Sequence, residues 1–315
     1  MSAPATLRRI AYLGPQGTFT EEALLSEPDL AECELVPMPT IAEAIGAADQ
    51  GVVEYAFVPI ENSIEGSVSA TLDQLVFDTD LLIQREVVLE VHLDLLAVAG
   101  ASLGGIRRVI SFPHATAQIR RYLAATLPGA SVGSTNSTAD AARLVAEGAD
   151  PEVAAVAPPL AAKLYGLDVL AHAIEDHAEN RTRFVLLTKA RIPEPTGHDR
   201  TAIACFQRAN RPGSLLEILA HFAARNVDLT RLESRPTKQA LGEYCFIIES
   251  EGHVSDVLLG DCLAELHEIL ESVRFLGSYP VSGAVSETRV GEVGEARRGA
   301  AEWLGNLRGL VGGSG

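Results

Sequence analysis

The stretch "AENRTRFVLLTK", residues 178–189, decides how the first half of the chain folds. It begins as a polar turn and ends in "FVLL", which has the composition of a buried strand. At the junction Thr182 stands between the guanidinium groups of Arg181 and Arg183. We interpret residues 182–189 as a strand that returns to a sheet begun near the N-terminus. The chain is therefore expected to cross twice between two lobes.

The region before residue 80 alternates strand-like and helix-like segments. Thr18 precedes Glu21, and Thr40 precedes Glu43, with the spacing of a capping box, so each threonine marks an expected helix start. This β-α-β-α-β order predicts a doubly wound α/β sheet whose ligands bind at the carboxyl ends of the strands. The expected strands are residues 8–14, 33–38 and 54–60, with helices at 18–25 and 40–50.

The long apolar stretch 81–100 is expected to carry the chain into a second lobe, where the alternation resumes. A cleft between two such lobes is the default position for a small ligand. The strands expected in this lobe are residues 107–112, 130–135, 152–158 and 167–174, and the helices are 114–127, 137–148 and 159–166.

Residues 190–200 contain two prolines and a glycine without periodicity, which is typical of a linker. The six segments in residues 201–280 then follow the order β-α-β-β-α-β, the ferredoxin-like arrangement. The tail after residue 280 is rich in Gly, Ala and charge. We expect much of it to be flexible, with at most a short helix around Trp303.

Composition excludes several functions. The 315 residues suffice for about two domains. A net charge of −17 argues against nucleic acid or an anionic membrane as a partner, so an anionic substrate needs a local binding site. No apolar run reaches membrane-spanning length and residues 1–9 lack a secretion signal, which predicts a cytoplasmic protein. The four cysteines show no zinc-site spacing, so we expect buried thiols and no metal.

Two segments of the first lobe are candidates for chemistry. The planar fork of Arg183 suits a carboxylate, and the Thr182 hydroxyl can donate to an oxygen that gains charge. The same pair also occurs at ordinary strand starts. In the polar loop 59–68, Asn62 and Ser63 precede an expected helix, whose N-terminus attracts anions. That loop is equally compatible with a capped turn without a ligand.

The strand-to-helix turns of the second lobe offer further polar groups. Ser111, Gln118, Ser137 and Thr138 are expected to face the cleft. His114 is compatible with either a structural or a catalytic position. Near the N-terminus, residues 14–17 suit an anion but match neither the dinucleotide fingerprint nor the P-loop, which disfavours a dehydrogenase or nucleotide-binding protein.

Together, "GPQGTFTEEA", "VPIENSIEGSV", "NSTADAA" and "ENRTRF", followed by "RPGSLLEIL" and "LESRP", resemble prephenate dehydratases with a C-terminal ACT domain over about residues 10–280. The resemblance implies a lyase that converts prephenate to phenylpyruvate, carbon dioxide and water in phenylalanine biosynthesis, with feedback control by phenylalanine. It implies no cofactor and no metal. The implied catalytic domain has two lobes, like a type 2 periplasmic binding protein. The implied boundaries are 8–190 for the catalytic domain (lobe one about 8–78 and 176–190, lobe two about 79–175), 191–199 for the linker, 200–280 for the ACT domain and 281–315 for the flexible tail.

The resemblance also implies roles for individual residues. Thr182 matches the family's catalytic hydroxyl, and Asn62, Ser111 and Gln118 match its substrate-orienting groups. We add Ser63 for orientation and Arg183 as a candidate for carboxylate binding. The implied phenylalanine site comprises Pro212, Gly213, Ser214, Leu215, Glu233, Ser234, Arg235 and Pro236. Because ACT domains pair, a homodimer or homotetramer is expected.

Two departures from the family pattern stand out. Many relatives read S-H-P-Q where this chain has Ser111, Phe112, Pro113 and His114, so the roles of Phe112 and His114 stay open. Ser214 stands where Ala is frequent, which leaves the choice of effector open. The main alternative function is a two-lobed sensor that binds an anionic or aromatic ligand without chemistry. With about ten residues before the first strand, no fused mutase domain is expected.

Overall fold

The computed structural model describes residues 8–189, 191–209, 211–238, 240, 242–283 and 303. The chain separates into two compact units, Met1–Arg191 and Ile192–Gly315. The division falls at the start of the predicted linker. Most of the predicted flexible tail lies outside the described residues. Trp303 itself is described and is helical, but the extent of the helix expected around it lies outside the described residues.

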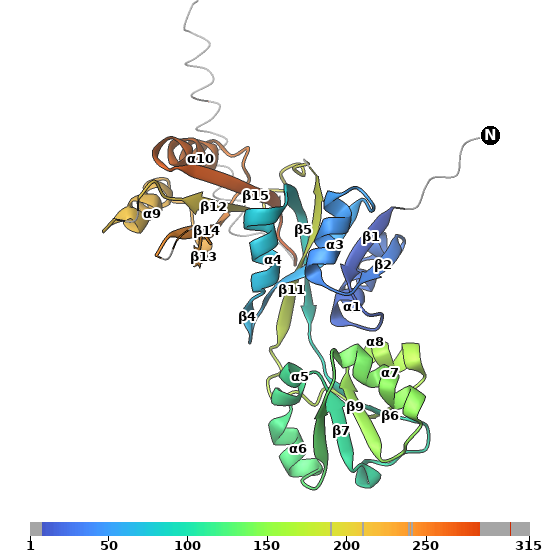
Figure 1. The fold of residues 1–315 in the computed structure, drawn as a ribbon. Helices are drawn as coiled ribbons and strands as arrows, with labels where there is room; N and C mark the ends of the chain where they lie inside the picture. The colour runs from blue at the N-terminus through green and yellow to red at the C-terminus, as the bar shows by residue number, and fades with distance from the viewer. Residues whose placement is uncertain are drawn as a thin grey trace, which may run out of the picture. The chain divides into compact units, whose positions relative to one another are not determined.

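The first unit contains a mixed sheet in the order β2-β1-β3-β11-β5 (Figure 1). Its first three strands are parallel, and β11 runs antiparallel to both of its neighbours, β3 and β5, so β5 has the same direction as the first three strands. The prediction that the strand at 182–189 returns to the first sheet is confirmed, since β11 lies between β3 and β5. The strands are β1 (Arg9–Leu13), β2 (Glu34–Met38), β3 (Tyr55–Asn62), β5 (Leu81–Glu90) and β11 (Arg181–Lys189), and the short β4 (Gly66–Ser67) pairs with β3.

Helices pack against this sheet because their apolar residues fall on one side. Leu24 of α1 and Leu30 of α2 join a buried cluster with Tyr12, Phe57 and Phe184 of the sheet. The Thr18 and Thr40 side chains accept hydrogen bonds from the backbone N–H groups three residues on, so both predicted helix starts are confirmed. The helices are α1 (Phe19–Leu25), α2 (Pro28–Ala31), α3 (Ile41–Asp49) and α4 (Ser69–Asp73), which continues into a π-helical turn (Gln74–Asp78).

A second sheet forms the other lobe of this unit, in the order β10-β6-β9-β7-β8. Alternate strand residues enter two buried clusters, one with α5 and α6 and one with α7 and α8, so helices cover both faces. Its strands are β6 (Asp94–Ala97), β7 (Arg108–Ser111), β8 (Ser131–Ser134), β9 (Val153–Ala157) and β10 (Asp168–Ala171). Its helices are α5 (Pro113–Ala117), α6 (Arg120–Thr126), α7 (Thr138–Gly148) and α8 (Pro159–Tyr165), with a 3-10 turn at Leu103–Gly105.

The structure corrects two expectations. The predicted helix 114–127 is two helices, because the chain leaves helical geometry at Ile119 and the Asp176 carboxylate accepts from the N–H groups of Arg121 and Tyr122 at the start of α6. The predicted loop 59–68 does not present a helix N-terminus as a ligand site. It turns back as a small hairpin, in which β4 pairs with Glu61 and Asn62.

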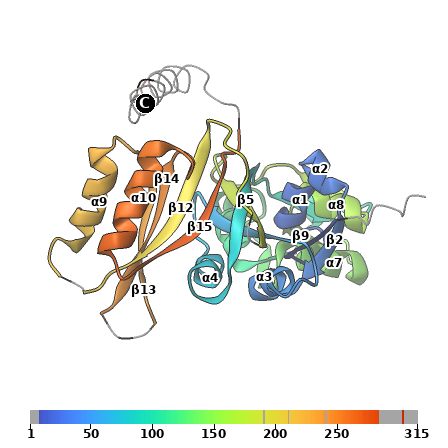
Figure 2. The same ribbon diagram turned by 90° about the horizontal axis from the view of Figure 1, so that it is seen from above.

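The second unit has the element order β12-α9-β13-β14-α10-β15 and the antiparallel strand order β13-β14-β12-β15 (Figure 2). The predicted ferredoxin-like arrangement is thus observed. Burial raises the pKa of the Cys205 thiol to about 12 and that of Cys262 to about 11, as expected for inert core thiols. The elements are β12 (Asp199–Phe206), α9 (Ser214–Ala224), β13 (Leu229–Pro236), β14 (Tyr244–Glu251), α10 (Val257–Ile269) and β15 (Ser272–Pro280). No helix among the described residues is long and apolar enough to cross a membrane.

Candidate active site

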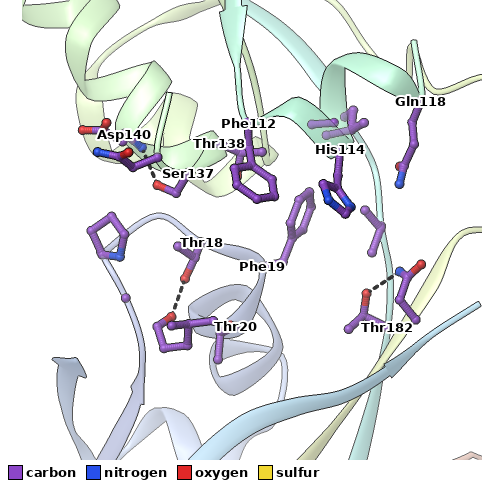
Figure 3. A pocket seen from close by; sticks show the side chains of 18 of the residues that line it. Thr18, Phe19, Thr20, Phe112, His114, Gln118, Ser137, Thr138, Asp140 and Thr182 are labelled. Atoms are coloured by element: carbon purple, nitrogen blue, oxygen red, sulfur yellow. Dashed lines mark hydrogen bonds between the residues drawn. The ribbon is translucent and has the colours of Figure 1, made fainter. Parts of the chain in front are cut away.

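A cavity of about 520 Å³ lies between the two lobes of the first unit. Its walls come from both sheets and from both chain crossings (Figure 3). The polar residues in its lining are Thr18, Thr20, Asn62, His114, Gln118, Asn136, Ser137, Thr138, Asp140, Asn180 and Thr182. Among the described residues, this lining contains no Lys or Arg.

Thr182 reaches the cavity from the start of β11, directly opposite Asn62 of β3. The Nδ2 group of Asn62 donates to the Thr182 Oγ1 over 2.9 Å. The Asn62 Oδ1 accepts from the backbone N–H groups of Ile64 and Glu65, which fixes the orientation of the amide. Since Thr182 Oγ1 acts as the acceptor in this contact, its own hydrogen is left to donate into the cavity.

Asn180 continues this polar chain toward the second lobe. It is 1% exposed, and its Oδ1 accepts from Asn62 Nδ2 over 2.8 Å. Its Nδ2 donates to the Gln118 Oε1 over 2.9 Å. Gln118 sits at the break between α5 and α6, where its carbonyl accepts from the N–H of Asp176. The sequence prediction of Gln118 and Asn62 at the cleft is supported by this placement.

A second polar region lies at the opposite side of the view in Figure 3. Ser137 and Thr138 stand at the N-terminus of the 11-residue helix α7, and Thr18 faces them from the N-terminus of α1. Helix N-termini carry partial positive charge and unpaired N–H groups, which attract anions. The expectation that Ser137 and Thr138 face the cleft is confirmed.

Aromatic side chains lie between these two polar regions in the same view. Phe19 comes from the first lobe, and Phe112 comes from the second lobe and stacks on His114 with ring centroids 5.2 Å apart. The Nδ1 of His114 lies 3.0 Å from a carboxylate oxygen of Glu65, across the mouth of the cleft. The cavity therefore suits a ring with polar groups at its two ends.

Arg183 does not reach the cavity, which corrects the expectation that it binds a substrate carboxylate. Successive residues of a strand point to opposite faces, so Arg183 points away when Thr182 points in. Its guanidinium is 2.9 Å from Glu61 and 3.1 Å from the buried Glu86. Arg181 is exposed and pairs with Glu90 over 2.7 Å.

Ser63 and Ser111 also lie outside the cavity lining. The Ser63 hydroxyl accepts from the N–H of Arg181 over 2.9 Å and donates to the carbonyl of Glu179, so it fastens the loop to the start of β11. Ser111 is fully buried, and its hydroxyl donates to the carbonyl of Val156 over 2.5 Å. Both hydroxyl groups therefore hold backbone in place rather than facing the cleft.

Two titratable groups beside the chain crossings have shifted pKa values. Burial raises the pKa of the Glu22 carboxyl on α1, helped by the charge of Asp94 and opposed by His92 and Lys163. The hydrogen bond that His92 donates to the Glu175 carboxylate raises the pKa of the imidazole. The His92 Nδ1 lies 2.9 Å from Glu175, whose other oxygen accepts from the N–H of Leu93.

The residues of the predicted phenylalanine site occupy one end of the sheet in the second unit. Gly213 caps α9 with a φ of 88°, and the hydroxyl of Ser214 accepts from the Gln207 side chain over 2.7 Å. Arg235 of β13 is opposite Cys245 of β14, which in turn is opposite Phe206 at the end of β12. The loop with Pro212, Gly213, Ser214 and Leu215 and the segment with Glu233, Ser234, Arg235 and Pro236 are thus at the same end, separated by β14.

Sequence reasoning missed Asn180, Thr20 and the cavity-facing role of Thr18. Asn180 precedes the recognised Thr-Arg-Phe motif by two residues, which was the available signal. The sequence pattern predicts only a helix start at Thr18, and in the structure this residue both caps α1 and lines the cavity. The pairing of Asn180 with Gln118 joins residues 62 positions apart, so local patterns could not reveal it.

The family model of prephenate dehydratase matches residues 10–192, which covers more than half of the chain. The chain belongs to the prephenate dehydratase family, the enzymes that convert prephenate to phenylpyruvate. The earlier identification from motifs is confirmed, and the alternative of a dehydrogenase finds no support.

Among similar proteins, the prephenate dehydratase of Amycolatopsis methanolica is 45% identical over 90% of this chain and 91% of its own length. The crystal structure of the Arthrobacter aurescens prephenate dehydratase in complex with L-Phe is 39% identical, with a TM-score of 0.82, and covers 94% of this chain and 99% of its own. A third structure, described as a quorum-quenching acylase, is 32% identical with a TM-score of 0.77, covering 87% and 98%.

Proposed function

We propose that this chain performs the prephenate dehydratase reaction in the cavity between its lobes, with Thr182 as the catalytic residue. The observation that carries the proposal is the hydrogen bond from Asn62 to the Thr182 hydroxyl oxygen. Because Asn62 holds the oxygen as an acceptor, the Thr182 hydroxyl is pre-organised to donate to the departing oxygen of the substrate.

The two ends of the cavity match the two ends of prephenate. Prephenate is a ring with a hydroxyl at one end and two carboxylates at the other. We place the ring hydroxyl at Thr182 and Gln118, the ring beside Phe112, and the carboxylates near Ser137 and Thr138. The hydroxyl groups and the N-terminus of α7 then bind the anions, in place of the Arg183 side chain predicted from sequence.

The reaction needs orientation and help for one leaving group. The electron pair of the ring C–CO₂⁻ bond enters the ring as carbon dioxide leaves. The C–O bond at the opposite ring carbon breaks, and the oxygen leaves as hydroxide, which takes up a proton to become water. The ring becomes aromatic. Since an aliphatic hydroxyl is a weak acid, Thr182 stabilises the leaving oxygen by a hydrogen bond rather than by full proton donation.

We infer that the two sheets of the first unit act as the two lobes of a type 2 periplasmic-binding-protein-like catalytic domain, and that the second unit is an ACT regulatory domain. The ferredoxin-like strand order of the second unit supports the second assignment. The related Arthrobacter structure holds L-Phe. We propose phenylalanine as the feedback effector, bound by the Gly213 loop and the Glu233–Pro236 segment.

A pairing of second units fits the free edge of their sheet. In the described residues β13 pairs with β14 alone and is the last strand of the order. Its Leu232 is 44% exposed, and Leu216 of α9 is 69% exposed. An open strand edge with exposed apolar side chains favours association. We propose a homodimer or homotetramer, which light scattering of the purified chain would test. The cytoplasmic location stays a prediction.

The proposed function is tested by incubating the purified chain with prephenate and measuring phenylpyruvate, with and without phenylalanine. We expect catalytic turnover that phenylalanine suppresses. A folded chain that binds prephenate without forming phenylpyruvate would contradict the lyase and favour the two-lobed sensor. Turnover that is indifferent to phenylalanine would contradict only the regulatory part.

A further inference from the structure

Asn180 lies where the two chain crossings and the two lobes of the first unit come into contact. It lies on the second chain crossing, immediately before β11, and is 1% exposed. Its backbone carbonyl accepts from the N–H of Val91, on the first crossing, over 2.8 Å. Its side chain contacts Asn62 of the first lobe and Gln118 of the second. One residue thus joins both crossings and both lobes.

Both polar atoms of the Asn180 side chain form hydrogen bonds. Its Oδ1 accepts one hydrogen of the Asn62 amide at 2.8 Å, while the other hydrogen of that amide goes to Thr182 Oγ1 at 2.9 Å. An amide nitrogen has only two hydrogens, and the carbonyl oxygen of Arg181 lies 3.3 Å away as a third acceptor. The N–H groups of Ile64 and Glu65 hold the amide oxygen, and the contact with Asn180 takes up the hydrogen that does not go to Thr182. A change at Asn180 therefore reaches the Thr182 hydroxyl through a single intermediate side chain.

The contact on the other side reaches Gln118 of the second lobe. The Asn180 Nδ2 donates to Gln118 Oε1 over 2.9 Å, and the Gln118 Nε2 lies 3.4 Å from a carboxylate oxygen of Glu65 in the first lobe. Movement of the second lobe relative to the first would shift Gln118 and thereby change its hydrogen bond with Asn180. The line Gln118–Asn180–Asn62–Thr182 is continuous through hydrogen bonds of 2.9 Å or less.

We propose that Asn180 is a positioning residue that couples closure of the second lobe to the orientation of the Thr182 hydroxyl. It touches no reacting atom and acts through Asn62. This inference rests on the proposed function, because it assigns Asn180 to the step that Thr182 assists. Its consequence is that the hydroxyl reaches its productive orientation only when Gln118 is in place.

A double-mutant cycle on kcat tests this role. Asn180→Ala is expected to lower kcat about 10- to 100-fold, the range for a displaced catalytic group, while KM changes less than about 3-fold. In the Thr182→Ala background the same substitution should lower kcat by less than about 3-fold, because the group that it positions is absent.

Thr188 supplies the matched control. It lies on β11 with Thr182, and its hydroxyl donates to the carbonyl of Glu54 over 2.8 Å, away from the cavity. In the Thr188→Ala background, Asn180→Ala should lower kcat by the same factor as in the wild type. Equal losses in the Thr182→Ala and wild-type backgrounds would overturn the inference, as would an unchanged kcat in Asn180→Ala alone.

Asn180→Asp keeps the test decisive if the alanine variant fails to fold. The carboxylate has the same size and still accepts from Asn62, but it presents no N–H group to Gln118. The same non-additivity with Thr182→Ala is expected, and an additive loss would contradict the inference. The failures are distinguishable: a wild type without phenylpyruvate formation removes the proposed function itself, whereas an additive cycle in an active enzyme removes only the role of Asn180.

Discussion

Asn62 and Thr182 are paired residues on adjacent antiparallel strands, and the amide of one donates to the hydroxyl of the other over 2.9 Å. This relationship explains why residues 120 positions apart act as one group. The sheet register brings them together, and two backbone N–H groups hold the Asn62 amide in the orientation that leaves the Thr182 hydrogen to the cavity. The proposed catalytic role of Thr182 rests on this geometry as well as on the motif.

We expect Arg183 to stabilise the first unit and not to bind the substrate. Arg183→Met leaves Glu86, which is 3% exposed, without its guanidinium partner and should destabilise the first unit by about 3–5 kcal/mol in denaturant unfolding. Adding Glu86→Met should recover most of the loss. Arg181→Met, at an exposed pair, is the control and should cost less than about 1 kcal/mol.

The outcome that contradicts this prediction is a stable Arg183→Met variant whose KM for prephenate has risen at least about tenfold, since each factor of ten in affinity is about 1.4 kcal/mol of lost binding. That result would show that Arg183 takes part in binding prephenate. We expect the KM of the folded variant to stay within about threefold of the wild type, because Arg183 points away from the cavity.

Glu22 should weaken the fold at neutral pH. Burial raises the pKa of its carboxyl, so the folded state holds a proton that the unfolded chain gives up as the pH rises past about 4.3. Stability is therefore lost as the pH rises through the raised folded pKa. Glu22→Gln should have a higher melting temperature than the wild type at pH 8 and no advantage at pH 4.

The exposed Glu32 offers the control for this comparison. Glu32→Gln should give nearly the same difference from the wild type at both pH values. An advantage of Glu22→Gln that is equally large at pH 4 and pH 8 would show that the substitution acts through packing rather than through ionisation.

His92, in contrast to Glu22, should stabilise the folded state through its charged form. Its hydrogen bond with Glu175 raises the pKa of the imidazole, so the charged form is favoured in the folded state. This contribution is complete below the unfolded pKa of about 6.5 and is lost as the pH rises through the raised folded value. His92→Gln should lower the melting temperature more at pH 5.5 than at pH 9. A loss that is independent of pH would contradict this origin.

Phenylalanine and prephenate should weaken each other's binding by the same factor, about 5- to 150-fold, because coupling between two sites is reciprocal. Calorimetric titration of each ligand with and without the other measures it. Gly213→Ala introduces a side chain at a φ of 88°, a strain of about 1–3 kcal/mol, and should raise the phenylalanine concentration needed for half inhibition.

Gly51 is the matched control, since it has a φ of 73° and, like Gly213, open space where a Cβ would lie, but belongs to the first unit. Gly51→Ala should leave the phenylalanine response unchanged. Titrations without any mutual effect of the two ligands would contradict the regulatory proposal, and an unchanged response in Gly213→Ala would contradict the position of the effector site.

The sequence predicted the elements better than the directions of their side chains. The helix starts at Thr18 and Thr40 and the return strand at 182–189 follow from local spacing and composition, and the structure confirms them. Thr182 and Arg183 could not both face one cavity, because strand residues alternate, and that conclusion was already available from the sequence. The role proposed for Asn180 could not be predicted from the sequence, since it depends on Asn62 and Gln118, which only the tertiary fold brings near.

The most direct test of the account compares the kcat of Thr182→Ala with that of Thr188→Ala, with prephenate binding measured for both. The two variants lose the same atoms from the same strand, but only one loses a hydroxyl at the cavity. We predict that Thr182→Ala binds prephenate and loses about 10²- to 10³-fold in kcat, as for other single donors to a charge that develops in the transition state. Thr188→Ala should keep the wild-type rate. Equal rates of phenylpyruvate formation in the two variants would contradict the central claim.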